Sequence, residues 1–322
     1  MKKSIAVTFI LSMVAYASVA GAPLKVICAS RADTPPVIDG RLDDQCWAKT
    51  EVREDFVPPS GESVALKRGT AMRMVYDDQN IYIGLQFFWD DIETLRKGID
   101  AIIKKFGQPD GQICKISNYA NQYGVELFID PAASEVNYYQ ILFNAAGQMT
   151  GHFKMRWDLF TGGPYFKSAI EGNCWTAEFV YPYKEVKPGS EWGINICRND
   201  ETYYSIWKPM GSAYNNPKKF GRLLIGNYDE WWNIVWGSGT LARLKEMDSD
   251  MDKYSLQDPH LKLLYDIVSK KAAELSAFSV EHPPENRENF ELLYTEYGDF
   301  KNSFDRLDHL YQTWRMINEA KN

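Results

Sequence analysis

The sequence lacks the short motifs that most hydrolases and phosphate-handling enzymes carry. It has no G-x-S-x-G elbow, no H-E-x-x-H pair and no phosphate-binding loop. Histidine is scarce, and three of the four histidines (His260, His282 and His309) lie near the C-terminus. A catalyst needs an acid–base pair or an activated nucleophile, and no such pattern is present. The sequence therefore favours a binding protein and predicts that the chain is not an enzyme.

Basic residues are fewer than acidic residues, 36 against 43. The 322 residues carry a formal net charge of −7, and no basic stripe interrupts this balance. Nucleic acids and anionic membranes both require a basic surface, so we expect neither as a partner. Beyond the first 20 residues no apolar run is long enough to span a bilayer.

Cysteine is present in an odd number without a recognisable framework. No C-x-x-C pair occurs, which excludes zinc ribbons and thioredoxin-like redox motifs. We expect these residues to be small buried apolar side chains, with at most one disulfide among them. The five cysteines are Cys28, Cys46, Cys114, Cys174 and Cys197.

The N-terminus has the pattern of a secretory signal. Lys2 and Lys3 precede an apolar run, and Ser18-Val19-Ala20 supplies the small residues of a cleavage site. This pattern predicts a signal peptide over residues 1–20 and a mature chain that begins near Gly21. We therefore expect export, either to the periplasm or to the outside of the cell.

Residues 21–226 have the pattern of a β domain. Short stretches rich in β-branched and aromatic residues are separated by Pro, Gly, Asn and Asp clusters, and residues 70–89 form a hairpin pattern. Alternating helices are missing, so an antiparallel β-sandwich is expected. Two helical interruptions are predicted, a short one near residues 42–49 and a longer one over residues 91–106.

Residues 227–322 follow a helical pattern after an apolar connector. Asp258-Pro259 is a typical helix start, and His282-Pro283-Pro284 ends the first helix. A second, longer helix repeats apolar residues at three- and four-residue spacing from Phe290 to Trp314. The pattern predicts an α-helical hairpin. Its apolar stripe would pack within the chain, or residues 258–320 would bind a second copy or another protein.

Side chains alternate across a strand, so three of the predicted strands can be divided into two faces. One face of residues 123–130, 136–144 and 191–199 is apolar and faces the core. The other face carries an acid and several amides that can hold the hydroxyl groups of a sugar. If the strands are neighbours, this polar patch consists of Glu126, Gln140, Asn144 and Asn195.

Six segments in a fixed order resemble the family 9 carbohydrate-binding modules and their relatives. PPVIDGRLDDQCW is similar to the opening signature of that family, and AMRMVYDDQNIYIGLQFFWD to its first long hairpin. GVELFID, CWTAEFVYPYKEV, INICRND and NPKKFGRLLI resemble its later strands. The resemblance runs from about Leu24 to Ile225. The helical region, residues 227–322, lies outside this resemblance.

The resemblance implies an immunoglobulin-like β-sandwich that clamps a sugar between two aromatic rings. Flat rings suit pyranoses because their C–H groups pack on a π surface, while amides and carboxylates hold the hydroxyl groups. Leu142 stands where some members carry an arginine, so the particular sugar does not transfer. The implied carbohydrate-binding residues are Tyr214 as one ring, Tyr119 or Tyr123 as the other, and Glu126, Gln140 and Asn144 as polar contacts.

Other functions remain as alternatives. Glu126 and Asp130 lie four residues apart on one strand face, about 13 Å at ~3.3 Å per residue, which is too far for a glycosidase pair. A haem-binding domain of the related DOMON type would use His152 with a methionine, from Met149, Met72 or Met74. An interaction protein would act through the C-terminal helices.

No cofactor is required by these patterns, although related modules often hold structural calcium. Aspartates near strand ends can supply oxygen ligands for calcium. The same residues also favour turns on their own account, so no ligands are assigned. The candidates are Asp77, Asp78, Asp90, Asp91 and Asp130.

Overall fold

The computed structural model describes most of the chain in seven stretches. The predicted signal peptide lies outside them, as does Cys114. The four cysteines within them are free thiols. The described stretches are residues 24–62, 66–107, 123–153, 164–200, 203–211, 215–253 and 258–319.

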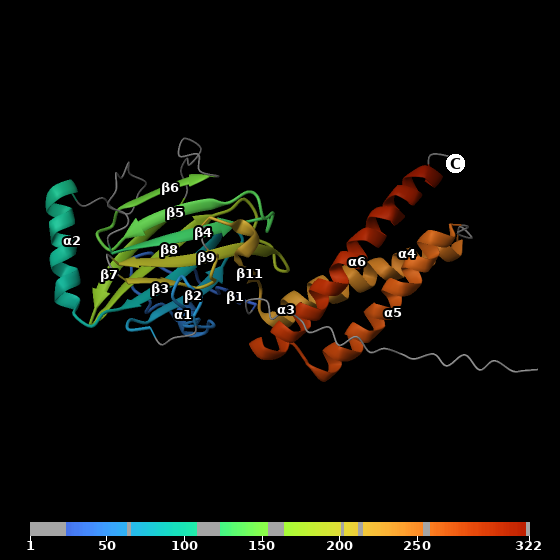
Figure 1. Cartoon of the computed structure of the whole chain (residues 1–322), viewed down its shortest axis with the longest axis horizontal. Coiled ribbons are helices and arrows are strands. Elements are labelled where there is room, and N and C mark those ends of the chain that lie inside the picture. The colour runs from blue at the N-terminus through green and yellow to red at the C-terminus, as the bar shows by residue number, and fades with distance from the viewer. Residues whose placement is uncertain are drawn as a thin grey trace, which may run out of the picture.

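The N-terminal part is mainly β (Figure 1). Its strands form one sheet in the order β6-β5-β4-β9-β11-β1-β2-β3-β8-β7, and β10 pairs with β9. Nine of these strands lie in segments whose pattern predicted a strand, and β1 and β10 were not predicted individually. Their bounds are β1 Val26–Arg31, β2 Thr70–Tyr76, β3 Asn80–Phe88, β4 Gly124–Asp130, β5 Tyr139–Asn144, β6 Met149–Phe153, β7 Tyr165–Glu171, β8 Cys174–Pro182, β9 Glu191–Asp200, β10 Tyr203–Ile206 and β11 Gly221–Ile225.

Strand β1 joins the two halves of this sheet. Its first residues, Val26–Ala29, pair in parallel with β11, and Ser30 and Arg31 pair in parallel with β2. The sheet is therefore continuous and curled, and two of its pairings are parallel, where the sequence predicted a wholly antiparallel sandwich. Pairing between segments nearly 200 residues apart leaves no local signal in the sequence, which explains the difference.

The core lies inside the curl and draws side chains from both halves. The apolar faces predicted for β4, β5 and β9 are confirmed, because residues such as Leu127, Ile141 and Ile196 are fully buried there. Helix α2 (Ile92–Phe106) adds Leu95 and Ile99 to the same core. Its N-cap is Asp91, whose side chain accepts hydrogen bonds from two backbone N–H groups, as a capping residue does.

The opening segment, residues 35–47, is held on the sheet by hydrogen bonds to one buried carboxylate. Glu178 of β8 accepts hydrogen bonds from the backbone N–H groups of Asp39 and Gly40, at 2.9 Å each. Its other oxygen accepts the indole N–H of Trp47 in α1 (Gln45–Ala48) at 2.8 Å. A buried carboxylate is tolerated where several donors satisfy it. Two sequence segments about 130 residues apart therefore share one contact.

The C-terminal part contains more helix than the sequence pattern predicted. Two consecutive helices lie where they were expected, and Asp258 caps the first of them. The segment interpreted as a connector is itself helical and includes nine residues of π-helix, a rare form. The elements are α3 Tyr228–Trp232, the π-helix Asn233–Leu241, α4 Ala242–Lys253, α5 Pro259–Glu281 and α6 Arg287–Glu319.

These helices pack against the outer side of the sheet where its central strands β1 and β11 meet (Figure 1). Val26 and Leu224 from the sheet share an apolar cluster with Trp231, Trp232 and Trp236. The outward sides of β1 and β11 are thus covered by the chain's own helices. Of the described residues, no helix is both long enough and apolar enough to cross a bilayer.

An ionic network crosses the same boundary. Arg53 is 2% exposed, holds both oxygens of Asp55 (Nε–Oδ1 3.0 Å, Nη2–Oδ2 2.6 Å) and donates to the carbonyl of Val26. Its Nη1 also lies 3.8 Å from Glu291 Oε1 on α6. Tyr228 of α3 donates to Glu51, a further ion-pair partner of Arg53. The two parts of the chain are therefore joined by buried charge as well as by apolar contacts.

Candidate functional site

The candidate site is a polar network on the face of the sheet that points away from the core. Glu126 of β4 accepts a hydrogen bond from the amide of Gln140 on β5 at 2.8 Å, and one from the amide of Asn199 on β9 at 2.6 Å. Cross-strand pairing explains this meeting, since β4 lies between β5 and β9. Burial raises the pKa of Glu126, and the two amide hydrogen bonds offset part of that rise.

The predicted patch is therefore partly formed. Glu126 and Gln140 meet as the pattern required, and both remain partly accessible. Asn195 is different, because it is fully buried and hydrogen-bonds both backbone groups of Lys208. The segment after β10 folds back over that end of the face. The apolar cluster beneath it consists of Phe128, Tyr138, Cys197, Ile206, Met210 and Phe220.

Two predicted ligand residues are buried in other roles. Tyr123 is 8% exposed, adopts a φ of +54° and packs against Trp89 and against Gly98 of α2. Asn144 is fully buried in the β5–β6 turn, where its side chain pairs with Gln148 and accepts the N–H of Ala146. As placed, neither side chain offers a surface to a sugar. Turn capping and core packing use the same residue types as sugar binding, which is why the pattern pointed to them.

The two other predicted rings, Tyr119 and Tyr214, lie outside the described residues. Asn215, the neighbour of Tyr214 in the chain, is described, and its side chain hydrogen-bonds the hydroxyl of Tyr138. Tyr138 lies on the same side of the sheet as Glu126, packed on Phe128.

The sequence reasoning missed one aromatic residue on this face. Tyr204 of β10 is 46% exposed and stands directly opposite Asn199. Directly opposed residues of an antiparallel pair project to the same side, so its ring flanks the Glu126 network. The signal was available in YYSI, where the alternation places Tyr203 on the core side and Tyr204 on the outer side. Without the pairing partner, neither tyrosine could be placed.

The geometry does not bring together the ligands predicted for haem. Met149 belongs to the core, whereas His152 lies on the opposite face of β6 and contacts the ring of Tyr138. Residues three apart on a strand project to opposite sides. Met72 and Met74 are core residues as well. One iron cannot be bound by His152 and any of these three methionines across the sheet.

The aspartates considered for calcium have local roles where they are described. Asp77 accepts hydrogen bonds from Tyr82 and Asn80, and Asp130 accepts them from Ser134 and the N–H of Glu135. Over the described stretches, no group of three His, Cys, Asp or Glu side chains is placed to hold a metal ion. Calcium binding therefore stays a prediction.

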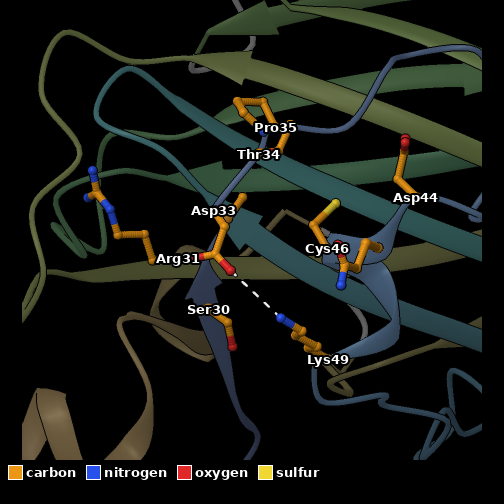
Figure 2. Close-up of a pocket in the computed structure, with 10 residues that line it drawn as sticks. Ser30, Arg31, Asp33, Thr34, Pro35, Asp44, Cys46 and Lys49 are labelled. Carbon is orange, nitrogen blue, oxygen red and sulfur yellow. Dashed lines mark ion pairs between the residues drawn. The ribbon is translucent and has the colours of Figure 1, made fainter.

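A separate cavity of about 230 Å³ lies between the end of β1 and α1 (Figure 2). Figure 2 shows Lys49 pointing toward Asp33 across it, and the pair is 3.7 Å apart. Arg31 at its rim pairs instead with Asp78, at 2.8 Å. The lining mixes both signs of charge and holds no exposed aromatic ring, so it lacks the flat apolar surface that a pyranose requires.

Comparison with known proteins identifies a family that matches this chain. The sequence profile described as "Carbohydrate family 9 binding domain-like" matches residues 38–227. The search of curated proteins returned no match. Among solved structures, a family 9 carbohydrate binding module from Caldicellulosiruptor kristjanssonii is similar at 18% identity. Its cellotriose complex has a TM-score of 0.43, with 63% of this chain and 94% of that chain covered. Its glucose complex also gives 0.43, with 64% and 98% covered.

Proposed function

The chain belongs to the carbohydrate family 9 binding domain-like family, and on this premise we propose that it binds carbohydrate without acting on it chemically. The binding surface is the outer face of β4, β5, β9 and β10. The observation that carries the proposal is the network of Glu126, Gln140 and Asn199, flanked by the exposed ring of Tyr204. The sequence has no G-x-S-x-G, H-E-x-x-H or phosphate-loop motif, which supports binding over catalysis.

Each part of this surface has a task in the proposal. Carboxylate and amide groups accept and donate hydrogen bonds to hydroxyl groups, and the network holds them in fixed positions before the ligand arrives. An exposed tyrosine ring packs on the C–H face of a pyranose. Tyr204 is one such ring, and Tyr214, which the resemblance to the family implies, is proposed as the second. Tyr119 remains a third candidate.

Three further features accompany this function. The signal-peptide pattern of residues 1–20 supports export. Structural calcium stays a proposal, and over the described residues no three His, Cys, Asp or Glu side chains are grouped to hold a metal ion. The C-terminal helices cover the chain's own β1 and β11, so we propose that they support the β domain. Assembly through residues 258–320 would use the sides that remain exposed, including Leu263 and Met316.

The aromatic platform can be tested by substitution. Tyr204→Ala and Tyr214→Ala are each expected to weaken carbohydrate binding at least tenfold, because a tenfold loss corresponds to about 1.4 kcal/mol, a reasonable contribution for one stacked ring. A glycan-array screen would identify a ligand, and calorimetry would compare affinities. The melting temperature should change little in Tyr204→Ala, since the side chain is about half exposed and lies outside the core.

Tyr183→Ala is the matched control. Tyr183 is also a surface tyrosine, 36% exposed, but it follows β8 and contacts Trp192 away from the Glu126 network. This variant should retain full affinity for the same glycan. If Tyr183→Ala weakened binding while Tyr204→Ala and Tyr214→Ala did not, the ligand would lie elsewhere on the protein.

A further inference from the structure

The carboxylate at the centre of the candidate site has no positive partner among the described residues. Both hydrogen bonds to Glu126 come from neutral amides, those of Gln140 and Asn199. Its opposite neighbours on β5 and β9 are Leu142 and Cys197, which carry no charge. The pKa of Glu126 is raised by burial, and no cation is among the causes that lower it.

Neutral donors alone can hold a buried carboxylate, as they do at Glu178, but Glu178 receives three such hydrogen bonds and Glu126 receives two. A carboxyl group that is withdrawn from water without an opposite charge, at a surface site, is a candidate for binding a ligand. The two amides occupy part of the acceptor capacity of Glu126, since an ionised carboxylate offers about four lone-pair sites. Capacity for a further donor remains at the partly accessible edge of the side chain.

The ring beside this carboxylate also suits a cation. Tyr204 lies two strands away from Glu126 and about two residues along, which places the two Cα atoms roughly 12 Å apart at ~4.8 Å per strand and ~3.3 Å per residue. The side chain of Asn199 lies between them, and a sugar ring would bridge Glu126 and Tyr204 over it. An aromatic face attracts an ammonium group as well as C–H groups. The chain's net charge of −7 further favours a cationic ligand.

We propose, on the basis of the function proposed above, that the ligand is an amino sugar with a free, protonated amine, as in oligosaccharides of glucosamine. The ammonium group pairs with Glu126 and completes the network that Gln140 and Asn199 begin. Tyr204 packs on the pyranose that carries the amine. Specificity then comes from the negative charge of Glu126, which no cation among the described residues neutralises and which the ammonium group of the ligand neutralises.

Three trimers with the same β-1,4 linkage test this inference, because they differ only at carbon 2. They are the glucosamine trimer, its N-acetylated counterpart and cellotriose, each measured by calorimetry on the purified chain. The glucosamine trimer should bind at least tenfold more tightly than either of the others. The ratio of the glucosamine-trimer affinity to the cellotriose affinity should fall to about one in Glu126→Gln, which removes the charge and keeps the shape.

Leu142→Arg provides an independent variant. Leu142 stands directly opposite Glu126, so a guanidinium there can reach the carboxylate and neutralise it from within the chain. The affinity ratio should then fall below one, because the new charge also repels the ammonium group. Melting temperatures confirm that both variants fold.

The outcomes separate this inference from the function on which it rests. Equal affinity for the glucosamine trimer and cellotriose would overturn the amino-sugar assignment and leave carbohydrate binding intact. A preference for the glucosamine trimer that survives in Glu126→Gln would overturn the role of Glu126. Failure of every glycan on an array to bind would overturn the proposed function itself.

Discussion

Replacing Gly40 with alanine is expected to lower the free energy of unfolding by about 4 kcal/mol or more, a large part of the total stability of a typical protein. Gly40 has a φ of +95°, where an L-residue costs about 1–2 kcal/mol. A Cβ at this position would also lie 2.5 Å from the carbonyl carbon of Ser168 and 2.8 Å from the backbone nitrogen of Ala169. Backbone atoms of a paired strand cannot move aside cheaply.

The surroundings of Gly40 increase this effect. Its N–H donates to Glu178, and its carbonyl accepts the hydroxyl of Thr176 at 2.6 Å. Any shift that relieves the overlap breaks these hydrogen bonds and loosens the opening segment from β8. Urea denaturation followed by tryptophan fluorescence measures the loss.

Gly172→Ala is the matched control, because it carries the energetic cost of a positive φ without the steric contact. Gly172 also has a positive φ, of +58°, yet no atom lies within 4 Å of a Cβ built on it. This variant should lose only about 1–2 kcal/mol. A similar loss in both variants would show that the contact of Gly40 with β7 is not tight, and the account of the opening segment would be wrong.

Replacing Arg53 with alanine is the second change with a large expected effect, a loss of about 3–5 kcal/mol in the free energy of unfolding. Arg53 is almost fully buried and binds both oxygens of Asp55. Its removal leaves Asp55, Glu51 and Glu291 close together without their shared cation. Because Glu291 belongs to α6, the substitution weakens the attachment of the helices as well as the sheet.

Arg31→Ala is the control for this prediction. Arg31 forms an ion pair with Asp78 at 2.8 Å, but both side chains are more than half exposed. Exposed pairs contribute about 0–1 kcal/mol, because solvent screens them. Both variants can be compared by thermal or urea denaturation. Equal losses would mean that burial of Arg53 adds nothing and that the network does not join the two parts.

The network also predicts how stability depends on pH. Burial alone would raise the pKa of Asp55, but hydrogen bonds from Arg53 and Lys25 hold it well below the ordinary value of 3.8. A depressed folded-state pKa contributes stability above the ordinary value and loses it as the pH falls toward the folded value. Unfolding free energy should therefore decline below about pH 4. In Arg53→Ala that decline should be smaller, as measured by denaturation at a series of pH values.

Local periodicity was sufficient to place most elements of the fold. The hairpin at residues 70–89, helix α2 and the helix start at Asp258 all follow from signals within a few residues of each element. The position of β1 between β11 and β2 does not, because its partners are distant in sequence. In the π-helix at residues 233–241, Trp236 packs against Tyr297, as does Trp232 just before it, and no local pattern records these contacts.

The candidate site was only half predictable for a similar reason. Alternation correctly assigned Glu126 and Gln140 to one face, and pairing of β4 with β5 brought them together. Alternation cannot tell whether that face is covered, so it treated Asn144 as a ligand residue although the turn after β5 buries it. Alternation also placed Asn199 on the outer side of its strand, but its contact with Glu126 required the pairing of β4 with β9, and the position of Tyr204 required the pairing of β9 with β10.

The most direct test of the account is a crystal structure of the protein with a bound oligosaccharide. We expect a sugar ring against Tyr204, with polar groups of the ligand within hydrogen-bonding distance of Glu126 and Gln140. A sugar found instead in the cavity beside Lys49, or among helices α4 to α6, with the face of β4, β5 and β9 empty, would contradict it.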